Sequence, residues 1–309
     1  MIIFTDENDE NKRIDSYLSE ITPDFSRSKI QNFIKNGDIL INGTVKKPSY
    51  TIKEGDKISF EIPEQKDLAI KAQNIPIEIV YEDENMAVVN KPSGMLTHPT
   101  TIEREGTLVN ALLYKYGDNL SDINGEFRRG ILHRLDRNTS GLLMIAKNNK
   151  AHEFLAEQIK NHSLTKKYLA VVKGVYPKDN DEINLAIGRN PHQPHKMMVR
   201  EDGKESRTLV KVLERFKEHT YLELTLITGR THQIRVHLSY KKHPIYNDTL
   251  YGAGQGKVKT EEQVLQSYYL SFTKPFGNEI IELQIEPDEK INKVLKYLTQ
   301  SMELSLIHI

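Results

Sequence analysis

The chain of 309 residues contains no cysteine. This absence excludes disulfides, a thiol nucleophile and thiolate metal ligands, and it fits the reducing cytoplasm that we predict as the location. Lysine plus arginine and aspartate plus glutamate both number 43, so net charge alone does not indicate a nucleic-acid partner. No apolar run approaches the ~20 residues of a membrane span, and the acidic start lacks the features of a signal peptide. We therefore expect no membrane association.

Motifs for nucleotide cofactors are also missing. The sequence contains neither a Gly-x-x-x-x-Gly-Lys-Ser/Thr loop nor a Gly-x-Gly-x-x-Gly loop, so we predict no cofactor. Of the eleven histidines, His232 and His237 are five residues apart and would point to different faces of a helix. His192 and His195 occupy a proline-flanked loop without an accompanying carboxylate. We therefore predict no metal site.

Changes in composition divide the chain into two predicted domains. A polar stretch without periodicity, residues 63–76, indicates a linker. We place a small domain at 12–72 and a larger one at 73–296. Residues 297–309 are expected to form a tail, because Leu304–Ile309 is an apolar ending without a cap and resembles the translation of a sequencing adapter. We treat this tail as partly artefactual and exclude it from fold reasoning.

The small domain shows the pattern of two helices and a hairpin. Ile14 and Leu18 recur at helical spacing, and Ser26 can cap a second helix that ends before Gly37. Asn42-Gly43 is a strong signal for a tight hairpin turn. The strands expected in this domain are residues 38–41 and 57–62.

Basic residues cluster within this domain, where Asp38 is the only acid between Ser26 and Lys47. Arg27 and Lys29 begin the second helix, and the positive end of a helix dipole favours phosphate. An alternative is that the lysines merely keep one face solvated. The order of helix, Ser-Arg-x-x-Ile helix, Asn-Gly hairpin and Gly-Asp strand resembles a small RNA-binding module shared with a ribosomal protein of the small subunit. We therefore predict RNA binding, with Arg27 and Lys29 as contacts.

The larger domain contains one stretch that suggests chemistry, Gly130–Leu143. It places Asp136 between Arg134 and Arg137 in a polar turn that runs into an apolar strand. A carboxylate beside arginines stays ionised, which suits a nucleophile or base rather than a proton donor. The arginines also indicate a phosphate-bearing substrate. For an isolated Arg-Leu-Asp, a surface ion pair would be the simpler interpretation.

Positive charge gathers around this turn. From Arg128 to Lys167 there are nine lysines and arginines against three acids, in a chain that is neutral as a whole. Such a local excess is typical of a surface that binds a phosphate backbone.

Two further motifs follow. Tyr168 lies in the expected strand 166–174, where most aromatic residues serve packing. After a strand of alternating leucines, Thr231 can cap a helix that carries Arg235 and follows Arg230. Both arginines could simply contact phosphate. Lys91, in an Asn-Lys-Pro-x-Gly string, could be a lysine at the edge of the core, and we assign it no catalytic role.

Together these motifs, from residue 12 to about 287, resemble the pseudouridine synthases of the large ribosomal-RNA type. The resemblance implies an α+β fold, with a mixed, mainly antiparallel sheet and a central cleft in the catalytic domain. It also implies isomerisation of uridine to pseudouridine in RNA without cofactor or metal. In such enzymes the uracil is detached from its ribose, rotated and rejoined through a carbon. Asp136 would start the cleavage by attack on sugar or base, or by proton abstraction.

The resemblance implies roles for the other motif residues. Tyr168 would pack on the target base and is a candidate base for the final proton removal. Arg235 would be the basic partner of Asp136, keeping it charged and oriented. Arg134 corresponds to the residue that fills the space vacated by the target base. Arg230 and His133 are expected as further substrate contacts.

Two departures from the family pattern bear on substrate choice rather than on activity. Leu265-Gln266-Ser267 replaces a common Leu-His-Ala, and Asn247 replaces a usual glycine, whose left-handed backbone asparagine tolerates. We expect a monomer that acts on large-subunit ribosomal RNA, with transfer RNA as another possible substrate. The alternatives are a non-catalytic RNA-binding or ribosome-assembly factor and an RNA hydrolase. The hydrolase would require a second carboxylate or a metal cluster that the sequence does not show.

Overall fold

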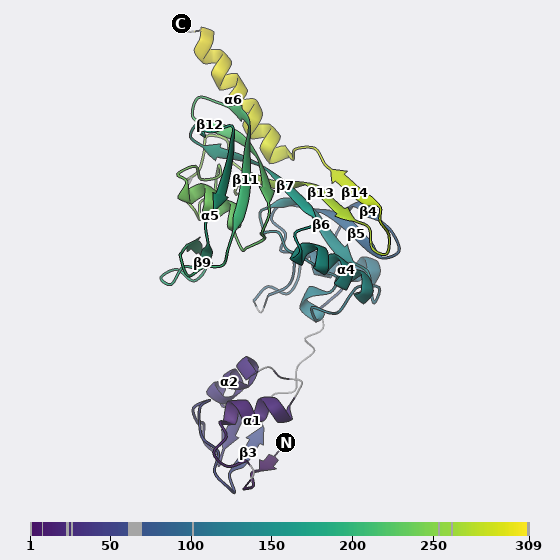
Figure 1. Ribbon diagram of the computed structural model, residues 1–309, viewed down its shortest axis with the longest axis vertical. Helices are drawn as coiled ribbons and strands as arrows, with labels where there is room; N and C mark the ends of the chain where they lie inside the picture. The colour runs from purple at the N-terminus through teal and green to yellow at the C-terminus, as the bar shows by residue number, and fades with distance from the viewer. Residues whose placement is uncertain are drawn as a thin grey trace. The chain divides into compact units, whose positions relative to one another are not determined.

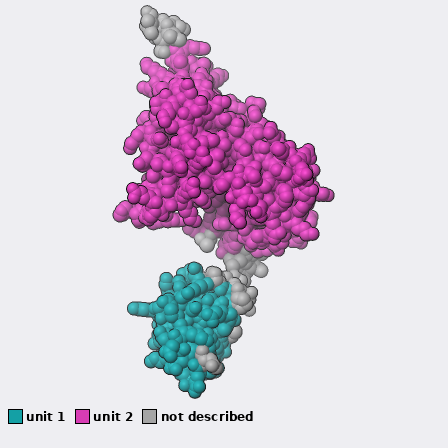
Figure 2. Space-filling view, viewed as in Figure 1, with its two compact units in different colours: residues 1–69 teal, residues 70–309 magenta. Residues whose placement is uncertain are grey.

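The computed structural model describes residues 2–7, 9–22, 25, 27–60, 70–100, 102–252, 254–260 and 262–307, without the side chains of Lys29 and of residues 304–307. The expected Ser26 cap, the last two residues of the expected strand 57–62, residues 63–69 of the expected linker and the last two residues of the tail lie outside this part. The chain divides into two compact units, residues 1–69 and 70–309, which Figure 2 colours separately.

The first unit contains the two helices and the hairpin expected from the sequence. In chain order, its elements are β1 (Ile2–Phe4), α1 (Ile14–Ile21), α2 (Arg27–Asn36), β2 (Ile39–Ile41) and β3 (Lys57–Phe60). The strands form an antiparallel sheet in the order β1-β3-β2. The sequence analysis missed β1, which precedes the expected start of the domain. The apolar faces of both helices cover the sheet, with Leu18, Ile30 and Ile34 fully buried.

The backbone of this unit confirms the two predicted turns. Asn42 and Gly43 have φ angles of 52° and 73°, the left-handed pair that a tight hairpin turn of this type requires. Gly37, with φ of 84°, follows the last residue of α2 as a helix-ending glycine.

The second unit is built on a nine-stranded sheet in the part of the chain that the structure describes (Figure 1). Its order is β4-β5-β6-β13-β7-β12-β11-β8, with β14 paired to β13. The strands are β4 (Glu78–Glu82), β5 (Met86–Lys91), β6 (Ser140–Ala146), β7 (Thr165–Lys173), β8 (Asn180–Asn184), β11 (Arg207–Arg215), β12 (His219–Leu226), β13 (Leu265–Thr273) and β14 (Ile280–Gln284). Among these described strands, only β6 and β13 pair in parallel, so the mixed, mainly antiparallel sheet is confirmed.

Helices and a small hairpin complete the unit. They are α3 (Leu108–Tyr116), a 3₁₀ turn η1 (Glu126–Arg128), α4 (Asn149–Lys160), α5 (Gln233–Tyr240), α6 (Glu289–Ile307) and the hairpin of β9 (Ile187–Arg189) with β10 (Met197–Val199). None of the described helices has both the length and the apolar character needed to cross a membrane.

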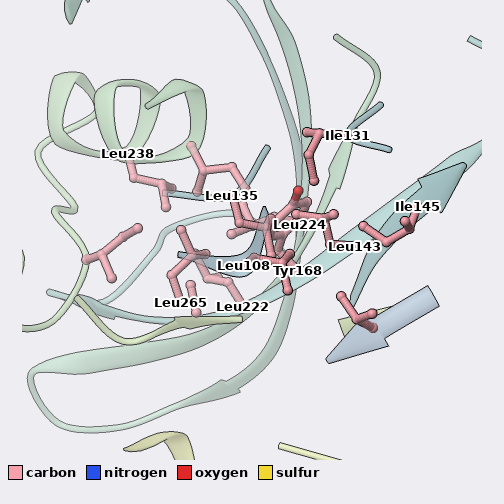
Figure 3. Packing of buried hydrophobic residues seen from close by; sticks show 14 of the residues in the cluster. Leu108, Ile131, Leu135, Leu143, Ile145, Tyr168, Leu222, Leu224, Leu238 and Leu265 are labelled. Carbon is pink, nitrogen blue, oxygen red and sulfur yellow. The ribbon is translucent and has the colours of Figure 1, made fainter. Parts of the chain in front are cut away.

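The start of β6 brings the Asp136 turn to the middle of the sheet. Every residue of β6 is buried, because Leu143 and Ile145 face one core cluster while Leu142 and Met144 face another. Burial on both faces explains the continuous apolar run. Gly141 (φ 113°) is required where β6 meets β13, since a Cβ there would lie 2.0 Å from the Ser267 carbonyl oxygen. Figure 3 shows the first cluster, with Leu135 and Tyr168 close to Leu224.

Three local expectations differ from the structure. The end of the expected linker belongs to the second unit, because Ile70 is buried in its core and the Gln73 N–H donates to the Asn110 carbonyl at 2.9 Å. Thr231 does not cap α5; the N-cap is His232, in a left-handed conformation and with no side-chain cap bond. Residues 297–307 continue α6, and Leu298 is buried against other apolar residues.

Candidate active site

A cleft of about 520 Å³ in the second unit collects six of the eight site residues predicted from the sequence. Its walls come from the Asp136 turn, the end of α4, β7 and the segment that leads into α5. The residues brought together are Asp136, Tyr168, Arg235, Arg134, Arg230 and His133. Arg27 and Lys29 belong to the first unit.

Asp136 is paired with Arg235 and shares it with a second carboxylate. Arg235 Nη1 donates to Asp136 Oδ2 at 3.0 Å, while its Nε and Nη2 donate to the two oxygens of Asp248 at 2.8 and 3.0 Å. Burial alone would lower the pKa of Arg235, but the hydrogen bonds and charge of Asp248, helped by Asp136, raise it. One buried guanidinium group thus bridges the side chains of Asp136 and Asp248 beside the cleft.

The sequence analysis missed Asp248, which is fully buried and orients Arg235. The sequence held only a weak signal for this role, namely an acid directly after the altered Asn247 position. Asp248 Oδ1 also accepts the Tyr251 N–H at 3.1 Å, and the Arg235 guanidinium lies 5.1 Å from the Tyr251 ring centre. The two-point contact leaves only Nη1 of Arg235 directed at Asp136.

His232 is a second residue that the sequence analysis did not place in the site. Its Nε2 lies 3.8 Å from Asp136 Oδ2, and its Nδ1 lies 2.8 Å from the Tyr251 hydroxyl. That hydroxyl accepts the Met197 N–H at 2.9 Å, which leaves its own hydrogen for Nδ1. Burial lowers the pKa of His232 despite the charge of Asp136. A neutral ring with its proton on Nε2 therefore faces the carboxylate.

The backbone on either side of Asp136 is anchored. The Leu135 carbonyl accepts the Thr97 hydroxyl at 2.9 Å. The fully buried Lys91 donates to the carbonyls of Arg137, Pro92 and Met95 at 2.9, 2.8 and 2.7 Å. Lys91 therefore holds the loop that carries Asp136 to the strand beside it, which gives it a positioning role rather than a catalytic one.

Tyr168 pairs with Leu224 on the neighbouring strand, belongs to the core cluster that also contains Leu135, and is 5% exposed (Figure 3). Burial raises its pKa well above the usual range, and the charge of Asp136 adds to the shift although a Ser267 hydrogen bond opposes it. The side chain is therefore a neutral phenol that contributes one wall of the cleft.

The remaining predicted residues of the cleft differ in how far their side chains are bonded to other parts of the protein. His133 Nε2 accepts the Met144 N–H at 3.1 Å, and burial lowers the pKa of this histidine to about 3, so its ring is neutral. Arg134 is exposed. Arg230 is also exposed and donates through Nε to the Glu205 carbonyl at 3.0 Å. Both arginines have N–H groups that can meet an anion.

In the first unit, Arg27 is partly committed to a neighbour. Its Nη2 donates to Asp15 Oδ1 at 3.0 Å, and 49% of the side chain is exposed. Asp15 is fully buried and also accepts from Arg13 and from Gln31, the latter at 2.6 Å. These bonds, led by the one from Arg13, lower the pKa of Asp15 in spite of its burial. The side chain of Lys29 lies outside the described residues.

Comparison with known proteins identifies the family. The family of RNA pseudouridylate synthases matches residues 85–240, and the S4 domain matches residues 12–58. The uncharacterised RNA pseudouridine synthase YlyB of Bacillus subtilis is 40% identical over 97% of this chain and 98% of its own. The ribosomal large subunit pseudouridine synthase D of Xanthomonas campestris is 35% identical over 94% of this chain and 89% of its own.

Solved structures agree with this relation. The human RNA pseudouridylate synthase domain containing 1 has a TM-score of 0.55 and 25% identity, and the match covers 74% of this chain and 96% of the human one. The chain therefore belongs to the RNA pseudouridine synthases and carries an S4 domain at its N-terminal end. Its reaction class is the isomerisation of uridine in RNA.

Proposed function

We propose that this enzyme converts specific uridines of large-subunit ribosomal RNA to pseudouridine, with Asp136 as the catalytic carboxylate. The observation that carries the catalytic assignment is the contact of Asp136 with Arg235 at 3.0 Å inside the cleft. The RNA assignment rests on relatives named ribosomal large subunit pseudouridine synthase D, at 35–41% identity to this chain. We propose a cytoplasmic enzyme that acts without a cofactor.

The target uridine has to leave its stack to reach the cleft. The exposed Arg134 would take its place in the RNA, while Arg230 and the wall containing His133 contact the extruded nucleotide. The S4 domain would hold the RNA and raise the effective concentration of the target loop, with Lys29 as a contact and with Arg27 contributing less, because one of its N–H groups is bonded to Asp15.

In the reaction the bond from ribose C1′ to uracil N1 breaks, and a bond from C1′ to uracil C5 forms. N1 gains a proton and C5 loses one, so atoms and electrons balance without an external reagent. Asp136 would start the cleavage by attack on sugar or base, or by proton abstraction. Arg235 holds the carboxylate in position through its Nη1, and Asp248 fixes the direction of Arg235. Preorganised charge of this kind needs little rearrangement during the reaction.

For Tyr168, the geometry supports packing on the uracil better than proton removal, because burial keeps the phenol neutral. Tyr168→Phe keeps the ring and removes the hydroxyl. We expect the variant to retain turnover within about tenfold of the wild type, since general-base catalysis contributes about 10²–10⁴-fold. Single-turnover rates on RNA that carries the unmodified target uridine would measure this. A loss of about 10³-fold with unchanged RNA affinity would instead make Tyr168 the base.

The test of the proposed function maps pseudouridine by carbodiimide-dependent primer-extension stops in ribosomal and transfer RNA. The RNA comes from a deletion strain complemented with wild type, with Asp136→Asn, or with Asp118→Asn as a matched control. Asp118 is fully exposed and forms only a surface ion pair with Arg129 among the described residues. Folding and RNA affinity of Asp136→Asn are measured in parallel and are expected to stay close to wild type.

We expect stops that vanish on deletion and return with wild type and Asp118→Asn, but not with Asp136→Asn. Stops confined to transfer RNA would refute the ribosomal assignment. Turnover by Asp136→Asn close to wild type would refute the role of Asp136. If no site is lost in any RNA, the non-catalytic RNA-binding or ribosome-assembly role replaces the proposed function.

A further inference from the structure

Lys166 is a buried lysine whose charge the mechanism above does not use. It lies on β7 two residues before Tyr168, and the two side chains line the same cleft, ~6.6 Å apart along the strand. Its exposed fraction is only 8%. Among the described residues, no hydrogen bond or ion pair reaches its ammonium group. A buried charge is usually paired, so this one is exceptional.

The surroundings of Lys166 keep the ammonium open to the cleft. Gly229 lines the cleft opposite Lys166, and a Cβ added there would lie 3.6 Å from Nζ, an ordinary van der Waals distance. The burial of Lys166 lowers its pKa to about 8, a value that leaves the amine mainly protonated at neutral pH. The charge of Lys166 also contributes to the lowered pKa of His133.

The other charges of the cleft make this wall a site for an anion. Lys160 and Arg230 line the cleft together with Lys166, whereas Asp136 is the only acid among the described lining residues. Asp136 is already bonded to Arg235. A neutral carbonyl of uracil could accept a hydrogen bond from Lys166 but would leave its charge uncompensated. A phosphate would offset that charge, and lysine is a common point-charge partner of phosphate.

We propose that Lys166 forms a phosphate subsite of the cleft, which binds the RNA backbone phosphate next to the target uridine. The inference rests on the proposed RNA substrate and adds a named contact to it. Lys166 is then a binding residue that holds the extruded nucleotide by its backbone, while Tyr168, on the same face of β7, packs on its base.

The first test compares the stability of the free enzymes. Lys166→Met preserves length and removes an uncompensated buried charge, so we expect Tm to rise, by about 2 °C or more. Lys296→Met, at an exposed position of α6, is the matched control and should leave Tm unchanged. A fall in Tm of Lys166→Met would show that the ammonium has a structural partner, and it would overturn the proposal.

The second test measures RNA affinity in the Asp136→Asn background, so that the RNA is not converted. The probe is a hairpin around the mapped uridine, with a single neutral methylphosphonate 5′ or 3′ of that nucleotide. We expect Lys166→Met to weaken binding about tenfold and to reduce the slope of log K against log salt by about 0.7, the value for one single-strand phosphate contact. At one of the two positions, the methylphosphonate should weaken binding to the enzyme that retains Lys166. The same methylphosphonate should have no further effect on binding to Lys166→Met. Lys166→Arg should retain the methylphosphonate effect.

A methylphosphonate effect that persists unchanged in Lys166→Met at both positions would overturn the subsite. So would a loss of kcat for Lys166→Met with unchanged affinity and salt slope, because the ammonium would then act on the base. These failures are distinct from failure of the proposed function, in which the wild type modifies no RNA. In that case the Tm comparison still decides whether Lys166 is free to bind an anion.

Discussion

The first unit, which contains the S4 domain, and the second, catalytic unit bury different ionisable groups. The described part of the S4 unit buries two acids, Asp56 and Asp15, and Asp15 receives hydrogen bonds from Arg13, Arg27 and Gln31. The catalytic unit buries the basic side chains of Lys91, Lys166 and Arg235 together with the acid Asp248. The S4 unit pairs Asp15 with arginines that are about half exposed. The large unit pairs Arg235 with a carboxylate that is itself fully buried.

This difference separates structural charge from functional charge. The hydrogen bonds of Asp15 come from its own unit, and its arginines remain hydrated on their outer side. In the catalytic unit, Arg235 holds Asp136 at the cleft, and Lys166 has no partner among the described residues. Charged groups that lack a partner within the protein are therefore the ones that can bind a ligand. A count of basic residues along the sequence does not show which groups these are.

Among the substitutions that test this difference between the units, we expect Asp248→Asn to have the largest effect on stability and turnover. It keeps the shape of the side chain but removes the charge that faces Arg235 at 2.8 Å in a fully buried position. We expect the free energy of unfolding of the catalytic unit to fall by about 3–5 kcal/mol, because a buried cation loses its main partner. Turnover should fall at least about tenfold, since Arg235 is no longer oriented. Denaturant unfolding and single-turnover rates measure the two effects.

The matched control for Asp248→Asn is Asp202→Asn, at an exposed ion pair with Arg200. Its effect on unfolding should stay within about 0.5 kcal/mol. A loss below about 1 kcal/mol for Asp248→Asn would contradict the view that buried pairing distinguishes the catalytic unit.

Asp15→Asn should have a smaller effect, confined to the S4 unit. The change removes the charged acceptor of Arg13 and Arg27, but both arginines can turn to water. We expect a loss of about 1.5–3 kcal/mol, the range for hydrogen bonds to a charged group. Amide hydrogen exchange, read separately for residues of α1 and α4, would locate the change. Faster exchange in α4, or a loss as large as that of Asp248→Asn, would contradict the comparison.

The response to pH provides a third contrast, because all eleven histidines follow residue 69. Burial lowers the pKa of His133 to about 3 and, with the charges of Arg134 and Arg128, that of His98 to about 4. Between these values and 6.5 the unfolded chain binds more protons, so the stability of the catalytic unit falls as the pH falls. The lowered pKa of Asp15 gives stability that is lost only below about pH 3.8, the unfolded value.

From pH 6.5 to 5.5 we expect the catalytic unit to lose about 1 kcal/mol for each of these two histidines. The S4 unit should stay nearly constant over the same range. Hydrogen exchange of each unit at several pH values checks this. His133→Gln should reduce the slope, whereas His195→Gln, at an exposed position, should leave it unchanged. Equal slopes in both units would mean that the histidines do not cause the dependence.

Local patterns and motif resemblance predicted much of the fold and the centre of the site. The β6 strand, the Asn42-Gly43 turn and the meeting of Asp136 with Arg235 all followed from neighbouring residues or from complete motifs. Asp248 could not be placed in this way, because it belonged to none of the motifs to which we assigned a function and its role depends on its contact with Arg235 in the folded chain.

His232 and Lys166 were missed for related reasons. His232 was considered only as a possible metal ligand, and its position beside Asp136 depends on the left-handed N-cap of α5. Lys166 was counted only as one positive charge among nine. Burial and the presence of a partner are properties of the packed structure, so they could not be read from residue type and spacing.

Arg27→Gln should have the smallest effect and tests whether a charge already paired in the protein also serves RNA. One N–H group of Arg27 is committed to Asp15, and about half of the side chain is exposed. We expect the dissociation constant for RNA to change by less than about threefold. The salt slope should fall by less than about 0.5, against about 0.7 for one complete phosphate contact on a single strand. Fluorescence anisotropy over a salt series measures both, with Lys296→Met as the control. A full change in slope would show that RNA draws Arg27 away from Asp15, and the S4 unit would then share the incomplete pairing that we assign to the catalytic unit.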